Sequence, residues 1–135
     1  RLMQTNVVSV PEFWTVGDAI DFLRQAEDLP GDFYSVIVVD PAYRPVGSVL
    51  LSRIMQNRRD AAIRDIMNTD IRPLKTEMDQ EEVAHLFRKY ALVEVPVVQP
   101  SGRLVGVVTV DDVVDVITEE DQEDIQKIGG IEALE

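Results

Sequence analysis

Apolar residues follow a helical period in two parts of the chain and form short β-branched runs after each part. The two helical faces consist of Val16, Ala19, Ile20 and Leu23, and of Val83, Leu86, Phe87 and Tyr90. The runs at 36–39 and 46–51, and later at 95–98 and 104–110, lie beside turns that contain proline and predict hairpins of buried strands. A last helix is predicted from Val110, with Val113, Val114, Ile117, Ile125 and Ile128 on one face, until Gly129 and Gly130 end it. The pattern predicts an α+β fold.

These elements occur twice because the sequence contains an internal repeat. Met3–Val7 recurs 64 positions later as Met67–Ile71, whereas Asp40–Gly47 recurs only 59 positions later as Gln99–Gly106. The second copy is therefore five residues shorter. The loop Asp28–Asp32, which contains turn-forming residues, is the expected place of the difference.

Each copy is predicted to fold as a β-α-β-β-α unit. We place the first repeat at 1–66, the second at 67–128, and the start of a connecting segment at 129–135. A unit of about 60 residues buries too little surface to be stable alone. We therefore expect the two repeats to pair about a pseudo-twofold axis into one structural unit.

Capping signals mark the start of both predicted helices. Each signal is a short hydrogen-bond acceptor with a carboxylate three residues later: Thr15 with Asp18, and Asp79 with Glu82. Phe13 and Trp14 precede the first cap, and we expect both rings to staple the helix start to the core.

The composition is that of a globular domain with an acidic surface. The chain has 25 acidic and 13 basic residues and a net charge of −12, which repels phosphate backbones and argues against a nucleic-acid partner. The absence of cysteine excludes a disulfide framework and agrees with an intracellular location. No apolar run reaches the roughly 18 residues of a membrane span. We expect a soluble piece of a longer protein, since the chain starts at Arg1 without an initiator Met.

The sequence gives little support for catalysis. The single histidine, His85, lies on a predicted helix whose apolar face is formed by other residues, and no serine or cysteine nucleophile spacing accompanies it. We expect His85 to be a surface residue and the protein not to be an enzyme.

Several motifs together resemble a tandem pair of CBS domains over nearly the whole chain. They are the repeated unit, the linker Ile63–Met67 and the run Gly106–Asp112. More narrowly, the segments 79–84, 102–113 and 123–129 are similar to the cytosolic CBS pair of MgtE-type magnesium transporters.

The resemblance implies a regulatory module on the cytoplasmic face of the cell membrane. Such a module closes in high Mg²⁺ and inhibits magnesium transport. The resemblance also implies a homodimer, with an amino-terminal helical domain and a carboxy-terminal membrane domain elsewhere in the same polypeptide.

Acidic residues concentrate toward the end of the chain. Eight carboxylates and no Lys or Arg lie between Asp111 and Asp124. Like charges three or four positions apart on a helix each cost roughly 0.2–0.5 kcal/mol. Divalent cations offset this cost, because Mg²⁺ prefers oxygen ligands and binds through one or two carboxylates while it keeps several waters. A solvated acidic face is the alternative interpretation.

The resemblance implies that Mg²⁺ ions bind between these acids and neighbouring domains. The residues that match the family's acidic positions are Asp79, Glu81, Asp112, Glu123 and Asp124. The sequence departs from the pattern at Ala91, where a relative can present another carboxylate, which puts one ion site in doubt.

A second motif, Gly106-x-x-Thr109-x-x-Asp112, resembles the ribose and phosphate grip of nucleotide-binding CBS domains. Thr109 and Asp112 are thus candidates for binding ATP or another adenine nucleotide. The alternative function is an adenosine-nucleotide sensor of another transporter or of a metabolic enzyme. The same pair is also a capping box that any helix start can use. The first repeat has Leu50 and Arg53 at these positions, which argues against a nucleotide site there.

Overall fold

The computed structural model describes residues 3, 5–31 and 33–114 of the chain. Its first repeat consists of β1 (Ser9–Pro11), α1 (Val16–Gln25), β2 (Ser35–Val39), β3 (Pro45–Leu50), α2 (Leu51–Gln56) and the linker helix α3 (Ile63–Ile66). Its second repeat consists of β4 (Leu74–Lys75), α4 (Gln80–Tyr90), β5 (Glu94–Val98) and β6 (Leu104–Thr109), after which residues 110–114 are helical. The rest of the predicted last helix lies outside the described residues.

The two repeats build two sheets of the same topology. The strand orders are β1-β2-β3 and β4-β5-β6. In each sheet the first strand runs parallel to the second, and the second and third strands form an antiparallel hairpin. The strand register shifts at Val38/Val39 in the first sheet and at Val97/Val98 in the second, which are equivalent positions of the predicted repeat.

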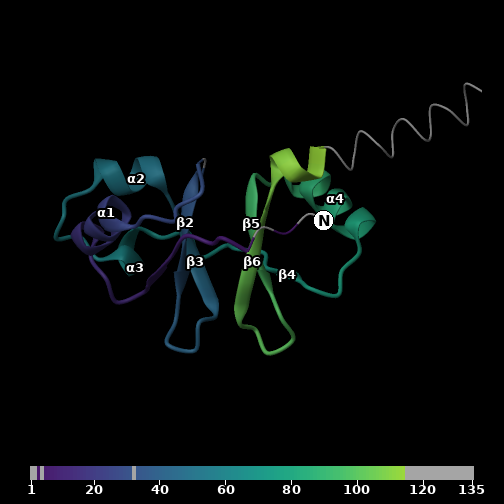
Figure 1. The fold of residues 1–135 in the computed structure, drawn as a ribbon, viewed down its shortest axis with the longest axis horizontal. Helices are drawn as coiled ribbons and strands as arrows, with labels where there is room; N and C mark the ends of the chain where they lie inside the picture. The colour runs from purple at the N-terminus through teal and green to yellow at the C-terminus, as the bar shows by residue number, and fades with distance from the viewer. Residues whose placement is uncertain (1–2, 4, 32, 115–135) are drawn as a thin grey trace, which may run out of the picture.

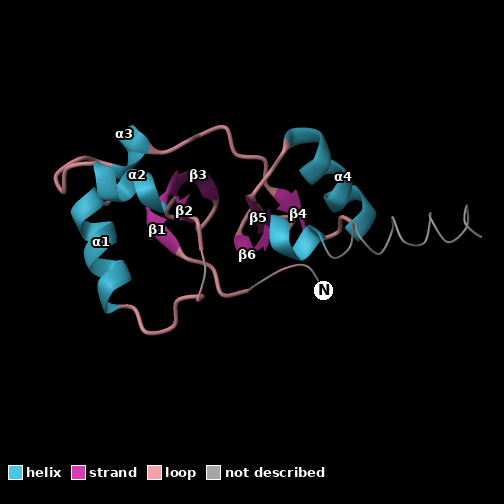
Figure 2. Ribbon diagram, turned by 90° about the horizontal axis from the view of Figure 1, so that it is seen from above, coloured by secondary structure: helices cyan, strands magenta, loops and turns pink. Residues whose placement is uncertain are grey.

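Helices cover the outer side of each sheet, and the inner sides of the two sheets face each other (Figures 1 and 2). The strand β2 shows why, because all five of its residues are buried. Val36 and Val38 join the outer core with α1 and α2. Ile37 and Val39 point the other way, as alternate strand residues must, and pack against Leu104 and Val107 of β6. We call this inter-sheet group the central cluster.

The capping signals act as predicted at both helix starts. At α1, the Thr15 Oγ1 accepts a bond from the Asp18 amide at 3.2 Å, and Asp18 Oδ2 accepts from the Thr15 amide at 3.0 Å. At α4, the Asp79 Oδ1 accepts from the Glu82 amide at 2.8 Å.

Trp14 packs on the hydrophobic core of the first repeat, as predicted. The prediction that Phe13 also staples the helix start to this core was wrong. Phe13 is 69% exposed, and of the two neighbouring aromatic residues only Trp14 packs against the core.

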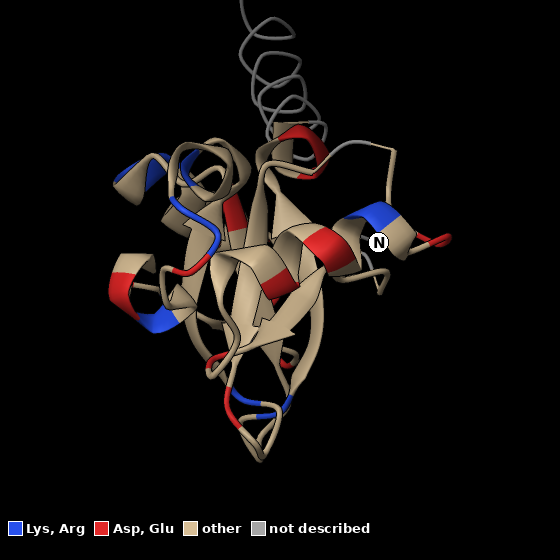
Figure 3. Ribbon diagram, turned by 90° about the vertical axis from the view of Figure 1, so that its left-hand side faces the viewer, with Lys and Arg blue, Asp and Glu red and all other residues tan. Residues whose placement is uncertain are grey.

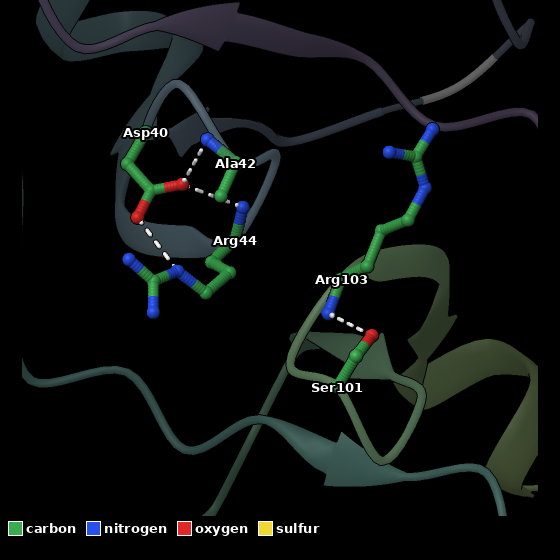
Figure 4. Close-up of polar contacts among 5 residues, drawn as sticks. All are labelled: Asp40, Ala42, Arg44, Ser101 and Arg103. Carbon is green, nitrogen blue, oxygen red and sulfur yellow. Dashed lines mark hydrogen bonds and ion pairs between the residues drawn. The ribbon is translucent and has the colours of Figure 1, made fainter.

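The two hairpin turns lie side by side at one end of the molecule (Figures 1 and 4). The Asp40 carboxylate closes the first turn by accepting bonds from the amides of Ala42 and Arg44, at 3.0 and 2.9 Å, and from Arg44 Nε at 2.9 Å. In the second turn, the Arg103 amide donates to Ser101 Oγ at 3.4 Å.

Tyr43 connects the two turns. Its carbonyl accepts a bond from the Leu104 amide at 2.9 Å, and its ring lies 5.0 Å from the Arg103 guanidinium. The Tyr43 backbone has a φ of 62°, and the equivalent residue of the second turn is Gly102, with a φ of 91°. A non-glycine residue in this region carries strain. The hydroxyl of Tyr43 lies 2.9 Å from Ser9 Oγ, so contacts on three sides hold the residue in place.

Charged residues of both signs are interspersed over the first repeat, and both signs also occur at the hairpin turns (Figure 3). Within the part of the chain that the structure describes, no helix combines the length and the hydrophobicity needed to cross a membrane.

Candidate functional site

A cleft of about 480 Å³ opens between the two repeats. It lies where the start of β2, the end of β3, the linker after α3 and the start of β5 converge. Its lining residues are Tyr34, Ser35, Ser48, Val49, Leu50, Arg53, Ile66, Met67, Asn68, Val93 and Glu94. The cleft has the size of a small-molecule site and combines apolar walls with a few polar groups.

Gly47 allows the linker to form one wall of this cleft. A Cβ at this position would lie 2.7 Å from Met67 Sδ and 3.0 Å from the Asn68 carbonyl oxygen. Asn68 and Ser48 exchange two backbone hydrogen bonds, at 2.8 and 3.0 Å, which fix the linker against β3. A side chain at position 47 would require Met67 to shift and would press on the Asn68 backbone, so the glycine permits this close approach of strand and linker.

Glu94 and Ser35 form the floor of the cleft. The buried Ser35 Oγ donates a hydrogen bond to Glu94 Oε1 at 2.7 Å, and the two residues occupy equivalent positions in the two repeats. Burial raises the pKa of the Glu94 carboxyl above its usual range, and hydrogen bonds from Ser35 and from the backbone of Tyr34 offset part of this shift. The floor therefore presents a carboxyl group that readily accepts a proton or a hydrogen bond.

Arg53 supplies a cation at the rim of the cleft. It lies on α2, and its Nε donates to the carbonyl oxygen of Ile66 at 3.0 Å. This bond holds the guanidinium beside the linker, and the side chain is exposed. Arg53 is thus an exposed residue that also lines the cleft between the repeats.

The Thr109–Asp112 pair lies at the start of the helical residues 110–114. The Thr109 hydroxyl donates to Asp112 Oδ2 at 3.0 Å, and the Asp112 amide donates to Thr109 Oγ1 at 3.5 Å. Thr109 is buried and Asp112 is half-buried. The geometry is that of the capping interaction, and neither residue lines the large cleft.

The predicted metal ligands are spread over two helix starts. Asp79 and Glu81 are exposed at the start of α4, Asp112 lies at the next helix start, and Glu123 and Asp124 fall outside the described residues. Among residues 3, 5–31 and 33–114, no three His, Cys, Asp or Glu side chains converge to hold a metal ion. Carboxylate oxygens suit Mg²⁺ chemically, so each described acid can supply one ligand, but these acids alone do not complete a site.

The sequence did not single out Ser35 and Glu94 as site residues. From the sequence, Arg53 argues against a nucleotide site in the first repeat, yet it lines the cleft. A signal was present, because Ser35 and Glu94 are polar residues that open otherwise apolar strands at matching positions of the repeat. His85 is exposed on α4, as predicted.

Replacing Glu94 by Gln is expected to change how stability depends on pH. Above the ordinary pKa of 4.5 and up to the raised value, the folded chain keeps a proton on Glu94 that the unfolded chain has released. The free energy of unfolding of the wild type therefore decreases as pH rises through this window. The amide introduced by Glu94→Gln stays neutral and can still accept the Ser35 bond, so the variant should lose this decrease.

Urea unfolding at a series of pH values from the acid range to neutrality measures the effect. Glu27→Gln, at a position in the loop after α1, is the matched control. If the stability difference between Glu94→Gln and the wild type were the same at every pH, the burial of Glu94 would have no energetic consequence.

Comparison with known protein families shows which family the two repeats belong to. The model of the CBS domain matches residues 1–60 and again 63–119, which together cover most of the chain. The chain belongs to the CBS domain family. This confirms the predicted fold class, an α+β tandem CBS pair.

Among curated relatives, the CBS pair is similar to the magnesium transporter MgtE of Thermus thermophilus, with 40% identity over 131 residues, 97% of this chain and 29% of that protein. It is also similar to the magnesium transporter MgtE of Enterococcus faecalis, with 35% identity over 99% of this chain and 30% of that protein. The chain thus spans about 30% of these relatives. The resemblance to MgtE-type transporters is confirmed.

Two solved structures have the same fold. The cytosolic domain of the Mg²⁺ channel MgtE in complex with ATP superposes with a TM-score of 0.78 at 40% identity, over 85% of this chain and 46% of that chain. The soluble part of a magnesium transporter superposes with a TM-score of 0.81 at 37% identity, over 88% of this chain and 46% of that chain. A match at 25% identity to inosine-5'-monophosphate dehydrogenase of Nitrosopumilus maritimus covers only 22% of that enzyme.

Proposed function

We propose that this CBS pair is the cytosolic Mg²⁺-sensing module of a magnesium transporter, and that it closes in high Mg²⁺ to inhibit transport. The observation that carries the proposal is the 40% identity to the Thermus thermophilus transporter over 97% of the chain. The net charge of −12 supports a cation as the ligand.

The mechanism follows from repulsion between carboxylates. When acidic surfaces approach each other within roughly 8 Å, the screening length at physiological ionic strength, their repulsion is only partly screened. Low Mg²⁺ then favours an open arrangement. Ions that bridge Asp112, Asp79 or Glu81 to acids of neighbouring domains favour the closed one, and by linkage the closed arrangement binds them more tightly.

The local contacts of these residues suit such a role. The Thr109 hydroxyl holds one oxygen of Asp112 at 3.0 Å, and the helix-cap bond holds one oxygen of Asp79 at 2.8 Å. Each of these two carboxylates is therefore oriented by the start of its own helix. Because the described acids do not complete an ion site, neighbouring domains or a second copy supply the other ligands.

The proposed partners are a second copy of the CBS pair and the other domains of the same polypeptide. About 70% of the length of the relatives lies outside the matched region. We propose that this remainder includes an amino-terminal domain and a membrane domain, which place the CBS pair at the cytoplasmic face of the membrane.

The combined replacement Asp112→Asn, Glu123→Gln and Asp124→Asn tests the proposal. We expect Mg²⁺ affinity, measured by calorimetry on the chain, to fall on the order of tenfold. In the intact transporter, inhibition of ion uptake by high Mg²⁺ should disappear.

A matched control removes the same number of charges elsewhere. Glu27→Gln, Asp28→Asn and Asp70→Asn are exposed positions outside the proposed ion sites, and this variant should keep both the affinity and the inhibition. Equal losses in the two variants would show that only net charge matters, and the named carboxylates would not be the sensor.

A second candidate function is nucleotide sensing, which the 480 Å³ cleft with its Arg53 rim favours. A solved relative, the cytosolic domain of the Mg²⁺ channel MgtE, is in complex with ATP. ATP titrations of Arg53→Ala and Thr109→Val separate the two candidate positions. Loss of binding in Arg53→Ala alone places the nucleotide in the large cleft, whereas loss in Thr109→Val alone places it at the Thr109–Asp112 pair. If both variants bound ATP as weakly as the wild type does, nucleotide sensing at these two positions would be excluded.

A further inference from the structure

An open groove of about 440 Å³ runs along the outer edge of the second repeat, between β4 and α4. We call it the α4 groove. Its lining residues are Arg72, Pro73, Leu74, Lys75, Met78, Glu82, Leu86, Tyr90 and Leu92. Met78 is held in the groove by a turn, since its amide donates to the Lys75 carbonyl oxygen at 3.1 Å.

The first repeat carries aromatic side chains at two of the equivalent positions. Trp14 and Phe22 occupy the positions that correspond to Met78 and Leu86, and their rings meet edge to face at 5.6 Å. Leu29 and Phe33, from the longer loop after α1, also pack on that core.

The second repeat has smaller side chains at these positions and a loop that is five residues shorter. The repeat architecture therefore does not require an open groove at this place. The smaller side chains of Met78 and Leu86 accompany the open groove in the second repeat.

Basic residues surround this apolar groove. The Arg72 guanidinium lies 4.1 Å from the centre of the Tyr90 ring, and the Lys89 ammonium lies 5.3 Å from it. Lys75, on β4, is exposed and also lines the groove. Glu82 is the one acidic residue among the lining residues. Glu77, which does not line the groove, has its pKa lowered mainly by a hydrogen bond from the Thr76 hydroxyl, and the charge of the nearby Lys75 contributes to the same shift. The lining itself holds two cations, Arg72 and Lys75, and one carboxylate, and in a chain with a net charge of −12 this small local excess of positive charge favours an anionic partner.

We propose that the α4 groove is a docking site for an acidic amphipathic helix. Such a helix would place its apolar face on Met78, Leu86 and Leu92 and its carboxylates against Arg72 and Lys75. An extended strand fits less well, because β4 has only two residues and follows Pro73, which has no amide hydrogen to donate to an added strand. The proposal is independent of the Mg²⁺-sensing function.

The test uses an 18-residue peptide with the sequence 111–128 of this chain as a model acidic amphipathic helix, labelled for fluorescence anisotropy. We expect binding that weakens with salt and that becomes roughly tenfold weaker in Arg72→Glu/Lys75→Glu. Met78→Trp, which fills the groove as Trp14 fills its equivalent, should block binding while it leaves both cations in place.

Arg24→Glu/Arg103→Glu is the matched control, because it reverses two cations that do not line the groove, and it should bind like the wild type. Thermal unfolding checks that every variant is folded. The proposal is overturned if the peptide does not bind, or if it binds equally to the wild type and Met78→Trp. It is also overturned if phosphatidylserine vesicles, but not the peptide, bind with dependence on Arg72 and Lys75, since the face would then contact a membrane.

Discussion

A chain that ends at Ile66 is expected to show no cooperative unfolding transition. Such a half-molecule would expose the inner face of its sheet, where Ile37 and Val39 are 1% and 5% exposed in the intact chain. Their partners in the central cluster, Leu104 and Val107, belong to the other repeat. A domain of about 60 residues is marginal even with a complete core.

Thermal unfolding followed by circular dichroism measures this directly, with the full 135-residue chain as the reference. A transition of the half-molecule as sharp and as stable as that of the full chain would show that the repeats fold independently. The central cluster would then contribute nothing to the stability of either repeat.

Replacing Ile54 by Ala is expected to lower the free energy of unfolding by about 2–5 kcal/mol, the usual range for such a truncation in a core. Ile54 is fully buried and joins α2 to the outer core of the first repeat. The cost includes both the lost burial and the cavity that remains, because the neighbouring side chains belong to several elements and cannot all move inward.

The neighbouring residue provides the control. Met55 is 67% exposed, so Met55→Ala should change stability by no more than about 0.5 kcal/mol. Urea unfolding with an unchanged slope distinguishes a loss of stability from a change in the unfolded state. Similar losses in both variants would show that α2 acts through helix propensity rather than through packing.

The internal repeat made most of the fold predictable. The valine-rich runs correspond to β2, β3, β5 and β6 to within one residue at each end, since short buried strands need a continuous apolar sequence. The caps at Thr15 and Asp79 were also predictable, because a helix start is a local interaction between residues close in sequence.

The site was less predictable because it depends on contacts between the repeats. The large cleft joins Arg53 to Glu94, residues that approach each other only after the two repeats pair. The exposure of Phe13 depends on the path of a single turn, which hydrophobicity does not specify. The Thr109–Asp112 motif predicted its own capping geometry correctly, since both partners lie in one turn of the chain.

The contact between Ser35 and Glu94 also bears on how two equivalent repeats can diverge. A residue near the pseudo-twofold axis meets its own counterpart, so two identical repeats would place serine against serine or glutamate against glutamate. Two buried glutamates would repel each other, whereas the unequal pair forms a hydrogen bond of 2.7 Å.

Because both copies belong to one polypeptide, serine can stand at position 35 and glutamate at the equivalent position 94. An assembly of identical single repeats would carry the same residue at both positions. Substitutions at positions 35 and 94 are therefore coupled and should be interpreted as a pair.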